Sequence, residues 1–224
     1  DSFGRFTRAD LEFEFRTSSL TADIGYAKVA ITMSLAFLPL LLNDYLFHGS
    51  SQVFWLLALL RTVAFLISIG ALLMVGRASV RTFDAIIILW SSSAVILELF
   101  VVAARPPGFF GAIASTSFII TILFLLVPQP LIRQLLLAGA LSVGHLILSL
   151  WIYPITDPVV WNTFLLIIFA SNGVGFFSSR ATQISKRNQF ILGKELAASE
   201  KHYRTLVQGE PRNSRLRVWA CKSP

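Results

Sequence analysis

Four ionisable side chains interrupt segments that are otherwise apolar: Asp44, Arg61, Glu98 and His145. A charged group near the middle of a bilayer costs about 2.5–3.5 kcal/mol on insertion scales, so each of these residues is expected to have a partner or a function. A carboxylate opposite a guanidinium can form a charge-assisted hydrogen bond, and a histidine can change its protonation state near neutral pH. We therefore predict that Arg61 pairs with Glu98, with Asp44 or with both.

These four residues support either a structural or a functional interpretation. In the structural one, Arg61 and Glu98 only join two helices, Asp44 extends to the outer interface, and His145 hydrogen-bonds to a neighbouring helix. In the functional one, they form a small polar cavity that opens outward, where His145 responds to a proton or contacts a ligand or a metal. Nothing fixes a metal-ligand spacing, so we predict no metal site, and the sequence identifies no cofactor. No residues have a recognisable catalytic spacing, and we predict no enzymatic activity for this chain.

These side chains lie within or beside long apolar runs. The 224 residues are 55% hydrophobic and only 14% charged, whereas soluble domains average about 25% charged residues. A membrane-spanning helix needs about 20 mostly apolar residues, and Gly- and Pro-containing segments separate six such runs. The runs are Ile24–Phe47, Val53–Val75, Ala85–Ala104, Phe109–Val127, Leu135–Ile152 and Val159–Phe177. We predict an all-α membrane protein with a six-transmembrane helical bundle.

The placement of Lys and Arg predicts the orientation of this bundle. One side carries most of the basic residues, at both ends of the chain and in the connection with Arg77 and Arg81, whereas the other side carries only Arg105. Cytoplasmic loops are enriched in Lys and Arg, so we expect both termini to be cytoplasmic. Aromatic residues at the opposite boundary agree with this orientation. They are Trp55, Trp151, Tyr153 and Trp161. The net charge of +7 therefore reflects membrane topology, and we expect lipid rather than nucleic acid as the partner.

Alternating spans place all four ionisable residues on the same side of the membrane. With a rise of 1.5 Å per residue, Asp44, Arg61, Glu98 and His145 lie roughly 5–12 Å below the outer ends of their spans. Because these spans run in alternating directions, the agreement in depth is not a result of adjacency in sequence. It favours a common cluster.

Polar sequence with helical periodicity follows the last span. Mostly apolar or small residues, with the polar Asn188 among them, recur there at intervals of three and four, which is typical of a coiled coil with one inserted step. They are Ala181, Ile184, Asn188, Leu192, Leu196, Ser199, Tyr203 and Leu206. A parallel homodimer through residues 178–207 and a single amphipathic helix on the membrane surface both fit, and we favour the dimer. Asn188, Leu192, Leu196 and Tyr203 would then transmit a signal. Asn172, which interrupts span six, is either a polar packing residue or the start of that route.

A short motif within this helix resembles a known signalling sequence. Residues 199–207 read SEKHYRTLV, which is similar to the S-E-x-x-[YF]-R-x-L run that leads into PAS domains of bacterial signalling proteins. Six spans with short outer loops and a helical linker also resemble the membrane input regions of multidomain bacterial sensors. In such proteins the input precedes a PAS, histidine kinase, diguanylate cyclase or adenylate cyclase module. The resemblance implies a bacterial plasma-membrane location and an input role, and it names no ligand.

These features predict four regions. Residues 1–23 form a cytoplasmic N-terminal segment, 24–177 a transmembrane sensor domain, 178–207 a coiled-coil signalling helix and 208–224 an irregular tail. The tail contains the single cysteine, Cys221, so no disulfide within one chain is expected. It does not resemble a PAS core, and we expect a truncated or frame-shifted end from which the output domain is missing.

Three function classes are compatible with these regions. The first is a sensory input module, in which a membrane signal or a small lipophilic ligand biases helix packing and span six passes the change to the coiled coil. The second is a small transporter or channel that uses the Asp44, Arg61, Glu98 and His145 cluster as its substrate or proton site. The third, an intramembrane enzyme, has the least support.

Overall fold

The computed structural model describes residues 8–35, 39–105, 110–152, 155 and 157–209, and these residues form helices and no strand. The helices, in chain order, are α1 (Ala9–Leu35), α2 (Leu40–His48), α3 (Gln52–Val75), α4 (Val80–Ala104), α5 (Phe110–Leu125), α6 (Leu131–Ile147) and α7 (Pro158–Gly209). A short π-helical segment, η1 (Leu148–Ile152), extends α6. The all-α class expected from the sequence is confirmed for the described residues.

Five helical stretches among the described residues are long and apolar enough to cross a membrane. They are Ala9–His48, interrupted by the undescribed residues 36–38, and Gln52–Val75, Val80–Ala104, Leu131–Trp151 and Pro158–Thr205. The apolar helix α5 has only 16 residues, which is shorter than the other five. By helix length and hydropathy, the chain is a multi-pass membrane protein.

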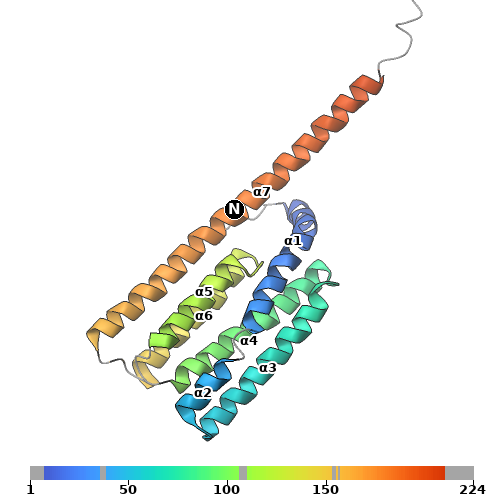
Figure 1. Ribbon diagram of the computed structural model, residues 1–224. Helices are drawn as coiled ribbons and strands as arrows, with labels where there is room; N and C mark the ends of the chain where they lie inside the picture. The colour runs from blue at the N-terminus through green and yellow to red at the C-terminus, as the bar shows by residue number, and fades with distance from the viewer. Residues whose placement is uncertain (1–7, 36–38, 106–109, 153–154, 156, 210–224) are drawn as a thin grey trace, which may run out of the picture. The chain divides into compact units, whose positions relative to one another are not determined.

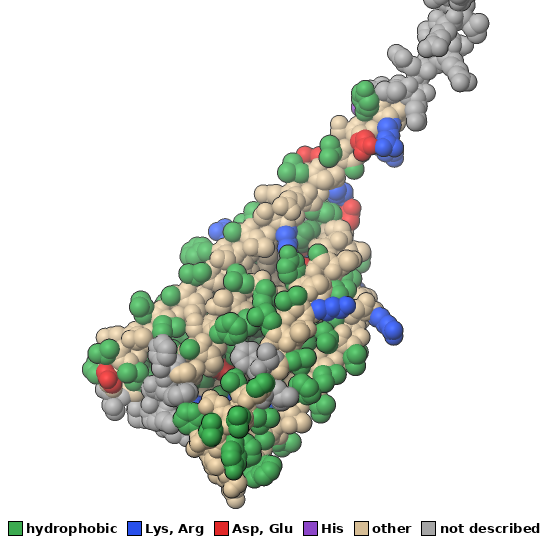
Figure 2. Space-filling model, in the orientation of Figure 1, with side chains coloured by type: hydrophobic (Ala, Val, Ile, Leu, Met, Phe, Trp, Pro, Cys, Tyr) green, Lys and Arg blue, Asp and Glu red, His purple; other side chains and the backbone are tan. Residues whose placement is uncertain are grey.

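Large apolar side chains cover the outer surface of the bundle. Leu42, Leu73, Trp151 and Phe169 are 67–84% exposed, and Figure 2 shows hydrophobic side chains over much of the visible face. Soluble monomers do not usually expose continuous apolar surface of this extent. The exposed side chains therefore have lipid as their natural surroundings.

Proline and serine residues set the ends of several helices. Pro39 precedes α2, and the first predicted run, Ile24–Phe47, covers parts of α1 and α2, with residues 36–38 between them outside the described residues. Proline is well suited to the start of a helix, because its missing amide hydrogen would have no partner there in any case. Ser51 and Ser79 cap α3 and α4, because their side chains accept hydrogen bonds from the backbone amides of Phe54 and Thr82. Such caps satisfy amide groups that a helix start leaves free.

The core lies among α1, α3, α4, α5 and α6, which pack in the pairs α1–α3, α3–α4, α4–α5, α4–α6 and α5–α6 (Figure 1). Its fully buried members include Phe83, Ile87, Ile120, Leu141 and Phe164. Phe164 comes from the first part of α7, so this part of the helix contributes to the same core.

Two glycines allow close approach between helices. A Cβ atom on Gly144 of α6 would lie 2.6 Å from Leu99 Cδ2 of α4, and one on Gly175 of α7 would overlap the Phe124 side chain of α5. Small residues allow helix backbones in membranes to approach in this way. At Gly173, two residues earlier on α7, an added Cβ atom would meet no other atom within 4 Å.

The chain divides into two compact units, Asp1–Thr182 and Gln183–Pro224. In the second unit the described residues continue α7 as far as Gly209, which agrees with the predicted helix over residues 178–207. Leu192, Leu196 and Tyr203 of the predicted apolar stripe are 63–71% exposed, and Asn188 is exposed as well. The predicted tail from residue 210 onward, including Cys221, lies outside the described residues.

Candidate functional site

Asp44 forms the centre of a buried ion-pair cluster. Its Oδ2 accepts a hydrogen bond from Arg61 Nε at 2.5 Å, and its Oδ1 accepts one from Arg105 Nη2. Asp44 is completely buried, and the Arg61 and Arg105 side chains are only 6% and 4% exposed. These three residues, hereafter the Asp44 cluster, bring two positive charges to one carboxylate where water is excluded, and each arginine is paired with it.

The α2–α3 hairpin explains why Asp44 and Arg61 meet. Gly49, which follows α2, has a φ of 56°, a left-handed conformation that glycine adopts without a Cβ penalty. The chain reverses there and α3 begins at Gln52, so that α2 and α3 pack together. The expected pairing of Arg61 with Asp44 is confirmed, whereas extension of Asp44 to the outer interface is wrong because hairpin packing encloses its carboxylate.

Arg105 is a site residue that the spacing of ionisable residues within the spans does not reveal. It directly follows α4, and its guanidinium carbon lies 4.3 Å from the centre of the Phe47 ring, one turn along α2 from Asp44. From the sequence, we used Arg105 only to predict the orientation of the bundle.

Glu98 pairs with hydroxyl groups and not with Arg61. Its Oε1 accepts hydrogen bonds from Ser115 Oγ at 2.5 Å and Thr116 Oγ1 at 3.3 Å, both from α5. Among the described residues no ion pair joins Glu98 to Arg61, so of the predicted alternatives the structure shows the pairing of Arg61 with Asp44.

His145 extends the Glu98 contacts toward α7. Its Nδ1 lies 2.9 Å from Thr116 Oγ1, so one threonine hydroxyl contacts both Glu98 and His145. The His145 ring also packs on Phe164 of α7, with ring centres 4.8 Å apart. His145 is only 3% exposed. The predicted helix-to-helix hydrogen bond of His145 is therefore present.

A cavity of about 340 Å³ lies between α1, α2, α3, α4 and α5. Arg61, Glu98, Arg105 and Ser115 contribute its charged part, and Ser34, Ser68 and Trp90 contribute a second polar group farther along α1, α3 and α4. Apolar side chains form most of the remaining wall. They include Ala64, Phe65, Ala94, Leu97, Ile119 and Leu123. Asp44 and His145 lie behind this wall: Asp44 contacts Arg61, which lines the cavity, and His145 reaches Glu98 through Thr116.

The second polar group of the cavity is satisfied within itself. Trp90 Nε1 donates to Ser68 Oγ at 3.2 Å and to Ser34 Oγ at 3.4 Å, and the two hydroxyl oxygens are 3.3 Å apart. The hydroxyls also donate to carbonyl oxygens of their own helices. This end of the cavity therefore makes little demand for a polar ligand group.

Asn172, predicted to transmit a signal, connects α7 to α6. Its Nδ2 donates to Ser142 Oγ at 2.9 Å and to the carbonyl of Ile168. Two further contacts join the same part of α7 to its neighbours: Ser171 to Ser117 of α5 at 2.5 Å, and Ser179 to Gln134 of α6 at 2.6 Å. The other predicted transmission residues, Asn188, Leu192, Leu196 and Tyr203, lie on α7 in the second unit.

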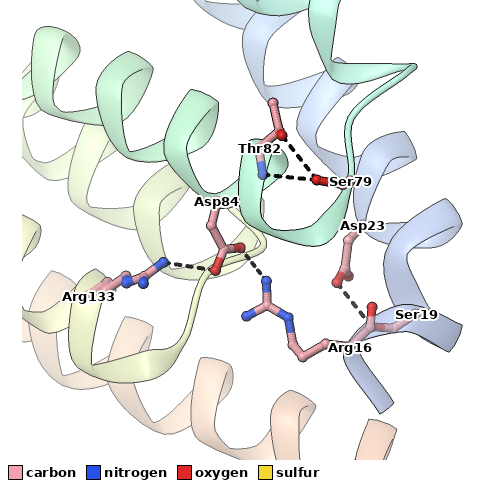
Figure 3. A network of polar contacts seen from close by, with 7 residues as sticks. All are labelled: Arg16, Ser19, Asp23, Ser79, Thr82, Asp84 and Arg133. Carbon is pink, nitrogen blue, oxygen red and sulfur yellow. Dashed lines mark hydrogen bonds and ion pairs between the residues drawn. The ribbon is translucent and has the colours of Figure 1, made fainter. Parts of the chain in front are cut away.

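A second arginine–aspartate–arginine cluster surrounds Asp84, near the start of α4. Asp84 accepts hydrogen bonds from Arg16 of α1 and from Arg133 Nη1 of α6, the latter at 3.1 Å (Figure 3). Asp84 is 21% exposed, so this Asp84 cluster is less enclosed than the Asp44 cluster. Asp84 and Arg105 are 21 residues apart along α4, or roughly 31 Å at 1.5 Å per residue, which is close to the thickness of a bilayer's hydrocarbon core.

The described residues contain no group of three or more His, Cys, Asp or Glu side chains that could hold a metal ion. The cavity presents charged and polar side chains that are able to form hydrogen bonds, and contacts through Thr116 and His145 join its wall to Phe164 of α7. No protein-family model matches this chain, no curated protein is detectably similar to it in sequence, and no solved structure matches it.

Proposed function

We propose that this chain is the membrane input module of a bacterial signalling receptor. A small lipophilic ligand or a membrane signal changes packing around the α1–α5 cavity, and α7 carries the change to a cytoplasmic PAS, kinase or cyclase output. The observation that carries this proposal is the contact series Glu98–Thr116–His145–Phe164, which begins in the cavity wall and ends on α7.

Helix α5 supplies a second connection between the cavity and α7. Ser115, Ile119 and Leu123 of α5 face the cavity, while Ser117 hydrogen-bonds to Ser171 and Phe124 closely approaches Gly175 on α7. A rotation or shift of α5 on ligand binding would therefore move side chains that contact α7. Packed helices with two discrete arrangements are the usual carriers of such coupling.

The second unit suits a helix that needs a partner. Leu192, Leu196 and Tyr203 are spaced by four and seven residues and are largely exposed, which is the pattern of a coiled-coil seam. A parallel homodimer would bury this stripe, and its weak polar positions would permit two packings of similar energy.

The proposed topology has six crossings and both termini in the cytoplasm. Helix α5 is the sixth crossing, because a 16-residue helix spans about 24 Å and a modest local thinning of the bilayer accommodates it. The basic residues around the Asp84 cluster, Arg16 and Arg133, then lie on the cytoplasmic side, as the positive-inside rule requires.

Cysteine cross-linking of the full chain in native membranes tests the dimer. In a Cys221→Ser background, Leu192→Cys should form a disulfide-linked dimer on mild oxidation. Lys201→Cys is the matched control, because Lys201 is also exposed but lies on the opposite face of α7 from Leu192. Equal cross-linking of the two variants, or none from either, would contradict the dimer.

Coupling to the cavity is tested in the same preparation. Thr116→Val removes the hydroxyl between Glu98 and His145, and it should change the rate of Leu192→Cys cross-linking. An unchanged rate, together with solute uptake into liposomes by the purified chain, would favour the transporter alternative over a receptor.

A further inference from the structure

The charged end of the α1–α5 cavity has hydrogen-bonding groups that the chain itself leaves unused. Arg61 is 6% exposed and donates Nε to Asp44. Its two terminal nitrogens have no hydrogen-bond partner among the described residues, although Arg61 lines the cavity. Buried guanidinium groups are normally fully hydrogen-bonded, so these donors point to a ligand acceptor.

Glu98 offers the complementary group. Its Oε1 receives the Ser115 and Thr116 hydroxyls, whereas within the described part of the chain Oε2 has no hydrogen-bond partner. Glu98 also lines the cavity. The same cavity end therefore presents guanidinium donors and a carboxyl oxygen acceptor to one occupant.

The charges at this end restrict the ligand. Arg61 and Arg105 bring two positive charges, and Asp44 and Glu98 bring two formal negative charges. An anionic head group would be attracted by Arg61 but repelled by the carboxylate of Glu98. A cationic head group would be repelled by the guanidinium of Arg61. Unbalanced charge is costly in a site from which water is excluded, so a neutral polar head fits better than either ion.

The rest of the cavity accommodates an apolar chain. Arg61 and Ser68 are seven residues apart on α3, and Trp90 and Glu98 are eight apart on α4, which corresponds to roughly 10–12 Å. The wall between them is mostly apolar, and the Trp90, Ser34 and Ser68 group beyond it is already satisfied. A volume of about 340 Å³ is at the small end of ligand pockets, which range over about 300–1,000 Å³.

We propose that the α1–α5 cavity binds a neutral, medium-chain amphiphile whose head carries both a hydrogen-bond acceptor and a hydroxyl or N–H donor. The acceptor contacts Arg61, the donor contacts Glu98, and the alkyl chain extends toward Trp90. This assignment rests on the proposed receptor function and deepens it by naming a ligand class, but binding at the site can be measured without any signalling output.

Quenching of Trp90 by a brominated probe tests the site directly. The probe is 10-bromo-1-decanol, added to the full chain in lipid nanodiscs, because a bromine at the chain end would lie near Trp90 when the hydroxyl contacts Arg61 and Glu98. We expect a saturable quenching component that disappears in Trp90→Phe. Quenching of the lipid-exposed Trp55 and Trp151 should instead rise with probe concentration in the bilayer and persist in that variant.

Two variants on α4 separate occupancy from misfolding. Ala94→Phe fills the cavity without touching an ion pair and should abolish the saturable component. Ile96→Phe is the matched control, because Ile96 is 53% exposed on the lipid side of the same helix, and it should leave the component intact. Quenching that survives Ala94→Phe, or no saturable quenching in the unmodified chain, would overturn the site.

Competition tests the head group. Unlabelled 1-decanol should displace the probe at a concentration at least about tenfold lower than decanesulfonate or decyltrimethylammonium, which stay charged at every pH. Glu98→Gln keeps the side-chain shape and removes one negative charge. The concentrations of 1-decanol and decanesulfonate that displace the probe should therefore differ less in this variant. Equal or tighter binding of either ion to the unmodified chain would overturn the neutral-head assignment.

The two proposals fail in different ways. If 1-decanol binds as described but leaves Leu192→Cys cross-linking unchanged, the result supports the binding site and contradicts the receptor function. If Thr116→Val changes the cross-linking rate while no probe binds, the result contradicts the proposed ligand class and supports coupling through Thr116.

Discussion

Asp44 and Asp84 are each held between two arginines, but Asp44 is completely buried and Asp84 is 21% exposed. Each carboxylate joins three segments of the chain: Arg61 and Arg105 meet at Asp44, and Arg16 and Arg133 meet at Asp84. The same arrangement of charges therefore occurs in two different environments within one chain. The two clusters should contribute differently to the free energy of unfolding.

Neutralising each aspartate measures that difference. Asp44→Asn leaves two arginines buried without their counter-ion and should lower the free energy of unfolding by about 3–5 kcal/mol. Asp84→Asn affects partly exposed pairs and should cost about 0–1 kcal/mol. Unfolding of the purified chain in detergent, followed by circular dichroism, measures both. Similar losses for the two variants would show that burial does not set the strength of these clusters.

The hydroxyl of Thr116 should couple Glu98 to His145 energetically. Thr116→Val and His145→Phe each remove one side of the 2.9 Å contact, and the double variant should lose less stability than the sum, with a coupling of about 0.5–3 kcal/mol. Thr121→Val is the control partner, because the Thr121 hydroxyl donates to the Ser117 carbonyl of its own helix. Additive losses in the Thr116 cycle would contradict a shared hydrogen bond.

Gly173 and Gly175 of α7 should respond oppositely to alanine. Gly175→Ala places a methyl group against Phe124, and such overpacking should cost about 1–3 kcal/mol. Gly173→Ala meets no atom within 4 Å and should be neutral or stabilising by up to about 1 kcal/mol, because alanine is the better helix former. Thermal unfolding of the two variants side by side is the measurement. A stable Gly175→Ala protein would mean that α5 and α7 do not pack closely there.

Cysteine accessibility tests the orientation. Arg77→Cys lies between α3 and α4, and Gln52→Cys lies at the opposite end of α3; both residues are exposed. In a Cys221→Ser background, a membrane-impermeant maleimide should label Gln52→Cys in intact cells and Arg77→Cys only after permeabilisation. Labelling of both from the same side would be incompatible with α3 as a membrane span.

Hydropathy predicts the helices well because lipid imposes one simple requirement, the internal pairing of every backbone hydrogen bond. The runs at Val53–Val75 and Ala85–Ala104 correspond closely to α3 and α4. The first run is less accurate, since α1 already begins at Ala9, well before Ile24. The first turns of α1 contain charged residues, and hydropathy alone does not reveal a helix that begins outside the apolar run.

Depth in the membrane correctly brings the ionisable residues toward one region, but it does not assign partners. Asp44 and Glu98 are equivalent carboxylates at similar depth, and only the α2–α3 hairpin determines that Arg61 contacts Asp44. The hydroxyls of Ser115 and Thr116 predict a polar helix face, yet their contact with Glu98 depends on how α4 and α5 rotate about their axes. Packing between helices sets this rotation, and the spacing of apolar residues along the sequence does not predict it.

The spacing of Asp84 and Arg105 along α4 has a consequence for the choice of membrane. Both ends of this helix form ion pairs with other helices, so tilting α4 by itself to match a thicker or thinner bilayer would separate charged partners. We therefore expect a mismatch to be taken up mainly by the lipid or by the bundle moving as a whole, at a cost of fractions of a kcal/mol per Å. The chain should then favour a hydrocarbon layer close to the length of α4.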